Sequence, residues 1–547
     1  MIDKIKIYKN LFQKKKFQEI INDIEKSDYN KNPQLLHILG ISKSFKSRDE
    51  KTLISARENF RSAYLIDKGS NLGLEALSNF IKLSADLLDV KDALKYYEQI
   101  NPKSLINLPI LKAISDVYKY TLQVKKRLDI LKKIIEIDKN SHDIWCSYIY
   151  ANNFINDWSQ EKFLNYSNKY NQLLKRYNFD DLKIDKNILG RKIKLGFFSS
   201  DFIQGHSIMY FLSGLLKNLD KDKYETFAIS NSKNDSKSEL IQNKFDNWIN
   251  VRSLNDKDAI NLLREKKIDI VFDLMGFTSD SRLVLFKNRI APIQISWLGY
   301  CNTTGIKEMD YLIADKKLIF KDEEKFYSEK IIKLNIWNAH DGYNSQRKKI
   351  ETPAIKKGFI TFGSFNNFNK ISTQALNIWC KILKKNKNSI LILKSSRVYN
   401  TEFLFETFKK EDLMDRVKIL NSSKNFSDHL KNYEHVDLAL DTFPYNGVTT
   451  TFEALWKGVP VLTIQGTNFN SRCGSSILYN LGLNYLIAND ESDYLLKASE
   501  LSLNFQMLKN LRDEIFNNLL NTKLFKSKNF ANDFESNIIK IIKERLI

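Results

Sequence analysis

Apolar residues recur at helical spacing through the first third of the chain, where Gly and Pro are scarce. The amphipathic segments come in pairs, 34–45 with 53–66, 72–87 with 90–100, and 110–122 with 126–137. The second pair closes at Asn101-Pro102. This spacing predicts helix–turn–helix repeats over residues 1–185, in preference to a plain helical bundle.

The segments DALKYYEQINPKS and RLDILKKIIEIDKNS resemble the second helix and closing turn of tetratricopeptide repeats, in a degenerate form. A repeat array of this kind would hold a peptide or protein partner on its concave face.

From residue 192 the pattern changes to short apolar runs that alternate with helical segments. The first series of predicted strands covers 192–198, 224–230, 269–276, 292–299, 310–315 and 330–336. A second series covers 358–367, 389–395, 416–420, 438–440 and 460–466. Such alternation predicts mainly parallel sheets in two α/β lobes, residues 186–350 and 351–547. Ligand-binding loops at the carboxyl ends of the strands would then face a cleft between the lobes.

The stretch 437–458 combines a strand, a turn and a helix start. An apolar run at 438–440 leads through Gly447 to three threonines, and helical spacing begins with Thr449 as the expected N-cap. A strand–turn–helix junction presents free backbone N–H groups and the positive end of a helix dipole, which suits a phosphate or diphosphate. Glu453 would accept hydrogen bonds from ribose hydroxyls. The alternative is an ordinary βα turn whose threonines only cap the helix.

Charge and cysteine content exclude several classes of protein. The formal charge is +21, but the excess is mostly Lys spread along the whole chain, so no nucleic-acid partner is expected. The four cysteines are far apart and show no metal-site or disulfide spacing. No apolar run approaches the length of a membrane span and no signal-peptide core is present. These features predict a cytoplasmic protein without a membrane span.

Several polar side chains follow the predicted strands. His206 lies in a loop after the first strand, and an imidazole there would suit a general base; the alternative is a plain hydrogen-bonding role. Lys370 follows the first strand of the second lobe and would direct an ammonium at a leaving diphosphate, with Asn367 beside it; the alternative is a solvated Lys. His429, before the threonine turn, would line a nucleotide pocket.

Two further patterns bear on the chemistry. The loop 302–305, Asn-Thr-Thr-Gly, would touch the sugar or phosphates or form a plain turn. The triplets 220–222 and 256–258 have the Asp-x-Asp form of metal-dependent sugar transferases, but they lie in Lys- and Asn-rich connecting segments. We interpret them as solvated charges and expect no metal and no cofactor, because a Lys and a helix N-terminus can stabilise a diphosphate.

With these residues assembled, the sequence resembles the O-GlcNAc transferase/SPINDLY family of protein glycosyltransferases. The resemblance rests on motifs that occur in family order between about 190 and 485: LGFFSSDFIQGHS, IDIVFDLMGFTSDSR, APIQISWLGYCNTTGIKEMDYLIAD, GFITFGSFNNFNKIS, LALDTFPYNGVTTTFEALWKGVPVLT and SRCGSSILYNLGL. It implies a GT-B fold, with two Rossmann-like lobes holding a nucleotide sugar while a protein Ser or Thr hydroxyl attacks the anomeric carbon. The reaction would invert the anomeric configuration, and the helical repeats would hold the acceptor protein.

The resemblance also assigns roles to individual residues. His206 matches a proposed base and Lys370 a diphosphate contact, and the nucleotide-sugar-binding set comprises Asn367, Lys370, His429, Thr449, Thr450 and Glu453. Val448 stands where the animal enzymes have His, and Asn367 and Glu453 replace their Gln and Asp. The wording of several motifs is closer to SPINDLY and its bacterial relatives. UDP-GlcNAc is the first donor expected, with GDP-fucose for O-fucosylation or UDP-glucose for Asn glucosylation as alternatives. A further alternative is a non-catalytic repeat scaffold with vestigial lobes.

Overall fold

The protein is described by a computed structural model covering residues 2–100, 106–233, 236–343, 347–395 and 397–546. The chain divides into two compact units. One comprises Met1–Ile144 with Tyr399–Glu406, and the other comprises Trp145–Val398 with Thr407–Ile547. In the described part of the chain, no helix is long and apolar enough to cross a membrane.

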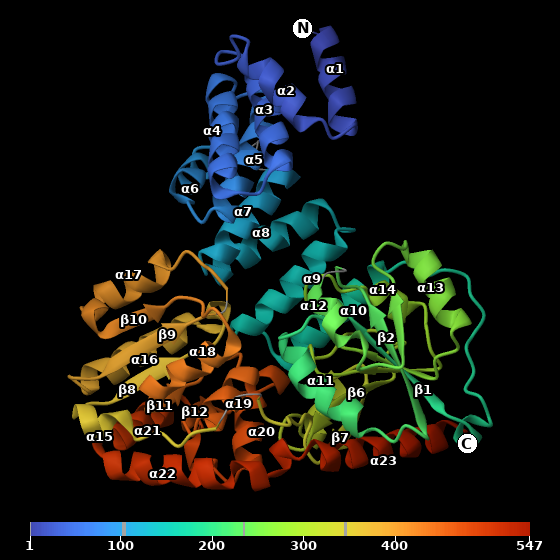
Figure 1. The fold of residues 1–547 in the computed structure, drawn as a ribbon, viewed down its shortest axis with the longest axis vertical. Coiled ribbons are helices and arrows are strands. Elements are labelled where there is room, and N and C mark those ends of the chain that lie inside the picture. The colour runs from blue at the N-terminus through green and yellow to red at the C-terminus, as the bar shows by residue number, and fades with distance from the viewer. Residues whose placement is uncertain (1, 101–105, 234–235, 344–346, 396, 547) are drawn as a thin grey trace. The chain divides into compact units, whose positions relative to one another are not determined.

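The first unit is built from antiparallel-neighbour helices, as its amphipathic pattern predicts (Figure 1). They are α1 (Ile2–Gln13), α2 (Phe17–Glu25), α3 (Pro33–Lys46), α4 (Glu50–Ile66), α5 (Asn71–Asp86), α6 (Lys91–Glu98), α7 (Leu108–Tyr120) and α8 (Val124–Ile137). Polar caps start several of them: the Asn32 side chain accepts from Gln34 N, and the Ser70 hydroxyl accepts from Gly73 N. Each of these helices packs on the helix before it, except that α7 packs on α5. The three predicted helix pairs are confirmed, whereas the turn at Asn101-Pro102 lies outside the described residues.

The second unit contains two all-parallel sheets. The first has the order β3-β2-β1-β4-β5-β6-β7, with β1 (Ile193–Ser199), β2 (Tyr224–Ser230), β3 (Asn247–Asn250), β4 (Ile270–Asp273), β5 (Ile293–Ser296), β6 (Tyr311–Asp315) and β7 (Lys330–Leu334). The second has the order β10-β9-β8-β11-β12-β13, with β8 (Thr361–Ser364), β9 (Ile390–Lys394), β10 (Val417–Leu420), β11 (Leu438–Leu440), β12 (Val461–Ile464) and β13 (Ile487–Ala488). All the predicted strands are present, and β3 and β13 are additional short strands at sheet edges.

Helices cover both faces of the sheets, which explains the nearly continuous apolar runs of the strands. Those of the first lobe are α11 (Ser207–Asn218), α12 (Ser236–Gln242), α13 (Asp256–Glu265) and α14 (Leu283–Lys287). Those after it are α15 (Pro353–Lys357), α16 (Thr373–Lys385), α17 (Glu402–Lys410), α18 (Phe426–Lys431), α19 (Thr449–Trp456), α20 (Cys473–Asn480), α21 (Glu491–Leu503), α22 (Phe505–Asn518) and α23 (Ser527–Leu546). Two more, α9 (His142–Ala151) and α10 (Gln160–Leu173), precede the first sheet.

In both sheets the strand order reverses beside the first strand of the series, between β1 and β4 and between β8 and β11. This is the doubly wound arrangement of a Rossmann-like lobe, so the predicted pair of α/β lobes is confirmed. Open α/β sheets bind ligands at such switch points, just beyond the carboxyl ends of the strands. The loops after β8 and β11 are therefore where a ligand site is expected in the second lobe.

The last helix returns to the first lobe. Figure 1 shows α23 beside α11, and the two helices are in contact. Its Phe530 and Phe534 rings lie 6.0 and 5.8 Å from the buried ring of Trp297 in the first lobe. The two lobes of this unit thus share a core that includes residues from the end of the chain.

Candidate active site

Lys370 lies directly beyond the switch point of the second sheet. It ends a short 3-10 helix, η5 (Phe368–Lys370), that follows β8. Its Nζ donates to the Asn446 carbonyl at 2.8 Å and lies 4.1 Å from the centre of the Tyr445 ring. Burial lowers the pKa of Lys370, and the Asp441 carboxylate opposes that shift. The ammonium is thereby fixed against the loop that follows β11.

That loop is organised around Asp441, which follows β11 directly. Its Oδ1 accepts from Gly447 N at 2.7 Å, and its Oδ2 accepts from the Thr463 hydroxyl at 2.7 Å. Burial raises the pKa of Asp441 to about 6. A Cβ on Gly447 would lie only 2.6 Å from Thr450 Oγ1, so the loop needs glycine at this position. We did not predict the role of Asp441, although its position after a buried strand was a usable signal.

Helix α19 begins at Thr449, and its N-cap is Val448, which makes no side-chain capping bond. The prediction of Thr449 as N-cap is therefore wrong by one residue, because the chain enters the helix at Val448. The first backbone hydrogen bond of the helix runs from Phe452 N to the Val448 carbonyl. The N–H groups of the three preceding residues therefore have no acceptor within the helix. The Thr450 hydroxyl donates to Asn366 Oδ1 at 2.8 Å, whereas the half-buried Thr449 hydroxyl has no hydrogen bond to any described residue.

Glu453 is buried one helical turn further along α19 and takes part in a polar chain. Its Oε2 lies 2.9 Å from His429 Nε2 and accepts from the Tyr433 hydroxyl at 3.0 Å. His429 Nδ1 lies 2.9 Å from Nζ of Lys394, the last residue of β9. Residues at i and i+4 share a helix face, so Glu453 lies below Thr449 on the same side. Lys394 and Tyr433 were not predicted as site residues.

Asn367 is half-buried and caps η5, with its Oδ1 accepting from Asn369 N at 3.0 Å. Its neighbour Asn366 is fully inside the loop network, where its amide bridges Thr450 and Asp441. Lys370, Asn367 and the start of α19 therefore belong to one connected set of loops at the carboxyl end of the second sheet.

His206 is the N-cap residue of α11 in the first lobe. Its Nε2 lies 3.7 Å from Asp201 Oδ1, and its buried Nδ1 has no hydrogen-bond partner among the described residues. Burial lowers the pKa of His206, Asp201 opposes this, and Arg397 beyond β9 lowers the pKa further. An imidazole in this state is neutral near pH 7 and can accept a proton.

The helix that carries His206 packs on the second lobe. The ring of Tyr210 lies 5.3 Å from that of Phe426 in α18, and Phe211 lies 5.1 Å from Phe452 in α19. These contacts connect α11 to the two helices that bear His429 and Glu453.

The loop 302–305 has a structural role, which favours the plain turn over the alternative of contact with a sugar or phosphate. Asn302, Thr303 and Thr304 are fully buried. Both threonine hydroxyls donate to the Glu329 carboxylate, at 2.7 and 2.5 Å. The Asn302 Oδ1 accepts from the Gln160 amide at 2.7 Å.

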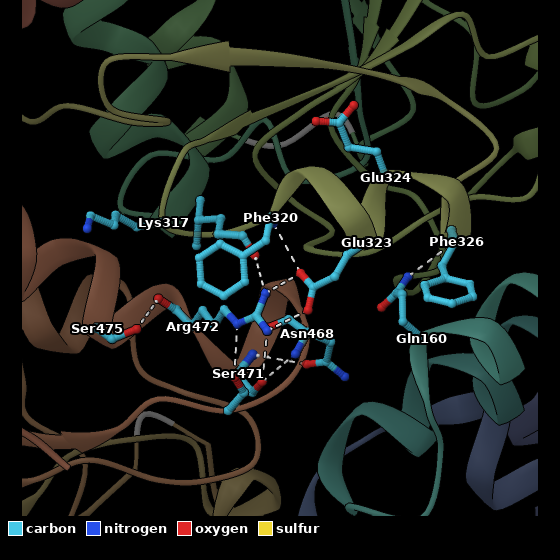
Figure 2. A network of polar contacts seen from close by, with 12 residues as sticks. Gln160, Lys317, Phe320, Glu323, Glu324, Phe326, Asn468, Ser471, Arg472 and Ser475 are labelled. Atoms are coloured by element: carbon cyan, nitrogen blue, oxygen red, sulfur yellow. Dashed lines mark hydrogen bonds and ion pairs between the residues drawn. The ribbon is translucent and has the colours of Figure 1, made fainter. Parts of the chain in front are cut away.

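A buried ion pair joins the lobes beside the site. Figure 2 shows Arg472, just before α20, pointing at Glu323 of the 3-10 helix η4 (Lys321–Phe326) and lying against the Phe320 ring. The guanidinium donates to Glu323 at 2.5 and 2.7 Å and to the Gly466 carbonyl at 2.9 Å. The first turn of α20 contacts the site, because Gly474 N donates to the Asn446 side chain. Helix α20 thus links the lobe contact to the loop that holds Lys370.

The two Asp-x-Asp triplets form ion pairs within the first lobe and are not part of the set of loops around Lys370. Asp256 starts α13 and pairs with Arg282 at 2.6 Å, while Asp220 pairs with Lys223 at 2.7 Å. In the described ranges of the chain, no three His, Cys, Asp or Glu side chains gather as a metal site requires.

Comparison with known proteins identifies relatives of this arrangement. The model of glycosyl transferase family 41 matches residues 164–337 and 344–534. The probable UDP-N-acetylglucosamine–peptide N-acetylglucosaminyltransferase SPINDLY of Oryza sativa is 30% identical over 424 residues, which are 74% of this chain and 45% of that protein. The corresponding SEC protein of Arabidopsis thaliana is 27% identical over 364 residues, 64% of this chain and 37% of its own. The chain thus spans about half the length of the curated relatives it matches or less.

The fold is also similar to a solved bacterial structure. An O-GlcNAc transferase variant from Thermobaculum terrenum superposes with a TM-score of 0.81 and covers 94% of this chain and 99% of its own. At 22% sequence identity, this likeness establishes the GT-B fold.

Proposed function

The chain belongs to glycosyl transferase family 41, and from this premise we propose that it is an inverting protein O-glycosyltransferase. It would move a sugar, GlcNAc from UDP-GlcNAc first of all, to a Ser or Thr of a protein acceptor. The observation that carries the proposal is the convergence of the Lys370 ammonium and the open N-terminus of α19 at the switch point of the second sheet.

A nucleoside diphosphate fits this convergence in a defined direction. The amides at the start of α19 and the Lys370 ammonium would bind the phosphates. Glu453 lies four residues along the helix, or about 6 Å at the usual rise, which matches the step from a phosphate to the ribose hydroxyls. Asn367 would contact the diphosphate beside Lys370, and His429 would lie beside the nucleoside.

The reaction would be an in-line displacement. The acceptor oxygen forms a bond to the anomeric carbon as the bond from that carbon to the diphosphate breaks, and the electron pair stays on the leaving phosphate oxygen. Lys370 and the α19 amides stabilise the charge that develops there. The hydroxyl proton passes to a base, for which His206 has a free, neutral nitrogen.

The helical repeats would hold the acceptor. A cavity of about 490 Å³ lies between α5 and α7 of the first unit, lined by Asn79, Lys82, Lys112 and Asp116 among others. The amide of Asn79 lies 3.1 Å from His37 Nε2 of α3, so polar side chains continue along neighbouring helices. Amide and ammonium donors of this kind suit the carbonyl groups of an extended peptide.

The test is turnover by the purified chain with UDP-GlcNAc, GDP-fucose and UDP-glucose offered together, followed by mass spectrometry of the modified protein. We expect a hexosamine on Ser or Thr. Fucose would identify the first alternative donor, and hexose on Asn the second. No transfer, with no thermal shift by UDP or GDP, would support the scaffold alternative.

Lys370→Met should lower kcat by about 100-fold or more, because its contact strengthens as the diphosphate leaves. Lys381→Met, on the exposed face of α16, is the matched control and should retain wild-type turnover. Wild-type kcat in the Lys370 variant would remove this residue from the mechanism.

A further inference from the structure

The polar chain behind Glu453 extends to a buried cation that the proposed reaction does not use. Lys394 is only 2% exposed and ends β9, which lies between β10 and β8 in the second sheet. A buried Lys costs free energy unless it is paired, so its retention in the sheet calls for a physical role. Its Nζ lies 2.9 Å from His429 Nδ1, and His429 Nε2 lies 2.9 Å from Glu453 Oε2.

The donors in this chain run in one direction. A lysine ammonium has hydrogens to give and no lone pair to accept with. His429 Nδ1 must then accept, which places the single imidazole hydrogen on Nε2, facing the carboxylate. Glu453 favours the charged form of Lys394, against the burial that lowers the pKa of this Lys. The result is a His429 imidazole held between a cation at Nδ1 and a carboxylate at Nε2.

These hydrogen bonds use one carboxylate oxygen of Glu453, Oε2, and leave the other, Oε1, open. His429 Nε2 and the Tyr433 hydroxyl both contact Oε2. Burial raises the pKa of Tyr433 well above its usual value, so this hydroxyl keeps its hydrogen. Among the described residues, Oε1 has no hydrogen-bond donor. A carboxylate fixed in this way offers one open oxygen at a defined place, one turn below the start of α19.

We propose that Lys394 is a positioning residue that, through His429, fixes Glu453 to select ribonucleoside over 2′-deoxyribonucleoside diphosphates. The inference rests on the proposed function, since it concerns the nucleotide of that same site. A ribose presents two adjacent hydroxyl donors to the open oxygen, whereas a 2′-deoxyribose presents one. Discrimination requires that the carboxylate cannot turn to compensate, and that constraint comes from the Lys394–His429 contact.

The experiment compares the dissociation constants of UDP and 2′-deoxy-UDP, and of GDP and 2′-deoxy-GDP, by calorimetry on the full chain. For the nucleotide with the preferred base, the wild-type protein should bind the ribose form about tenfold or more tightly, as expected for a hydrogen bond to a charged group. In Lys394→Met this ratio should fall to about two or less. Both affinities come from one preparation, so a partly unfolded variant still gives a valid ratio.

Two further variants separate positioning from general damage. Lys387→Met, at the exposed turn before β9, makes the same substitution near the opposite end of the strand and should keep the wild-type ratio. In a His429→Phe background, Lys394→Met should change the ratio no further, because the relay is already interrupted. Independent, additive effects would show that Lys394 does not act through His429.

The outcomes distinguish the inference from the proposed function. Nucleoside diphosphate binding without a ribose preference, or a preference that survives Lys394→Met, would overturn the inference and leave the glycosyltransferase proposal standing. Failure of the wild-type chain to bind any of the four nucleotides would overturn both.

Discussion

The ion pair between the lobes allows a quantitative prediction. Arg472→Met removes a guanidinium that is 4% exposed and that donates to Glu323 through two nitrogens. Breaking a buried pair by removing one partner costs about 3–5 kcal/mol, and loss of the cation–π contact with the Phe320 ring adds about 1 kcal/mol. The Glu323 side chain is 21% exposed and regains water, which reduces the cost. We expect Arg472→Met to lower the free energy of unfolding of the second unit, which contains both lobes, by about 3 kcal/mol.

Differential scanning calorimetry measures this cost. A loss of about 3 kcal/mol in unfolding free energy should lower the Tm of the second unit by roughly 3–6 °C. Glu323→Gln should cost less, because an amide oxygen still accepts one bond, and the double variant should cost less than the sum of the two single variants. Arg176→Met is the matched control: this Arg is 69% exposed and lies 4.0 Å from Glu308, so its loss should cost under about 1 kcal/mol.

The functional readout follows from α20. Because Gly474 donates to Asn446, and Asn446 holds Lys370, a displaced α20 should raise the donor KM more than it lowers kcat. A Tm within about 1 °C of wild type for Arg472→Met, or strictly additive effects in the double variant, would refute the reasoning that this pair holds the lobes together.

Three other predictions concern the site itself. His206→Gln should lower kcat and abolish the acidic limb of the pH–rate profile; because burial lowers the pKa of His206, that limb should lie below pH 6.5 in the wild type, and an unchanged limb in the variant would exclude His206 as the base. Gly447→Ala should weaken nucleotide binding about tenfold, since its Cβ would meet Thr450 Oγ1 at 2.6 Å and Asn366 Oδ1 at 2.8 Å, whereas Gly69→Ala, with nothing within 4 Å, should leave binding unchanged by calorimetry. Turnover should persist in EDTA; complete loss restored by Mn²⁺ would contradict the expected metal independence.

The sheets could be predicted from the sequence because their strands are buried on both faces and therefore consist of continuous apolar runs. For this reason β2 was predicted with its observed bounds, Tyr224–Ser230, and β11 with Leu438–Leu440. The strand β3 was missed because Asn247 and Asn250 enclose only two apolar residues at a sheet edge. The helix pairs of the first unit were predictable because amphipathic periodicity persists over several turns.

Contacts between distant segments were not predictable to the same degree. The motif around Thr303 has the small polar composition of a ligand loop. Its two threonine hydroxyls instead donate to Glu329, which lies 26 residues after Thr303. Conversely, Lys394 looked like one more Lys in a Lys-rich chain, and only the fold places it behind His429. Local patterns indicate which loops end at a site, whereas the partners of each side chain depend on segments that are remote in sequence.

The return of α23 to the first lobe has a consequence for biosynthesis. The Trp297 indole is completely shielded from water, and part of that shield is Phe530 and Phe534. These two rings are synthesised more than 200 residues after Trp297. Until then, the apolar face of the first lobe that they cover is exposed to water. During that interval the growing polypeptide depends on chaperones or on rapid elongation to avoid aggregation.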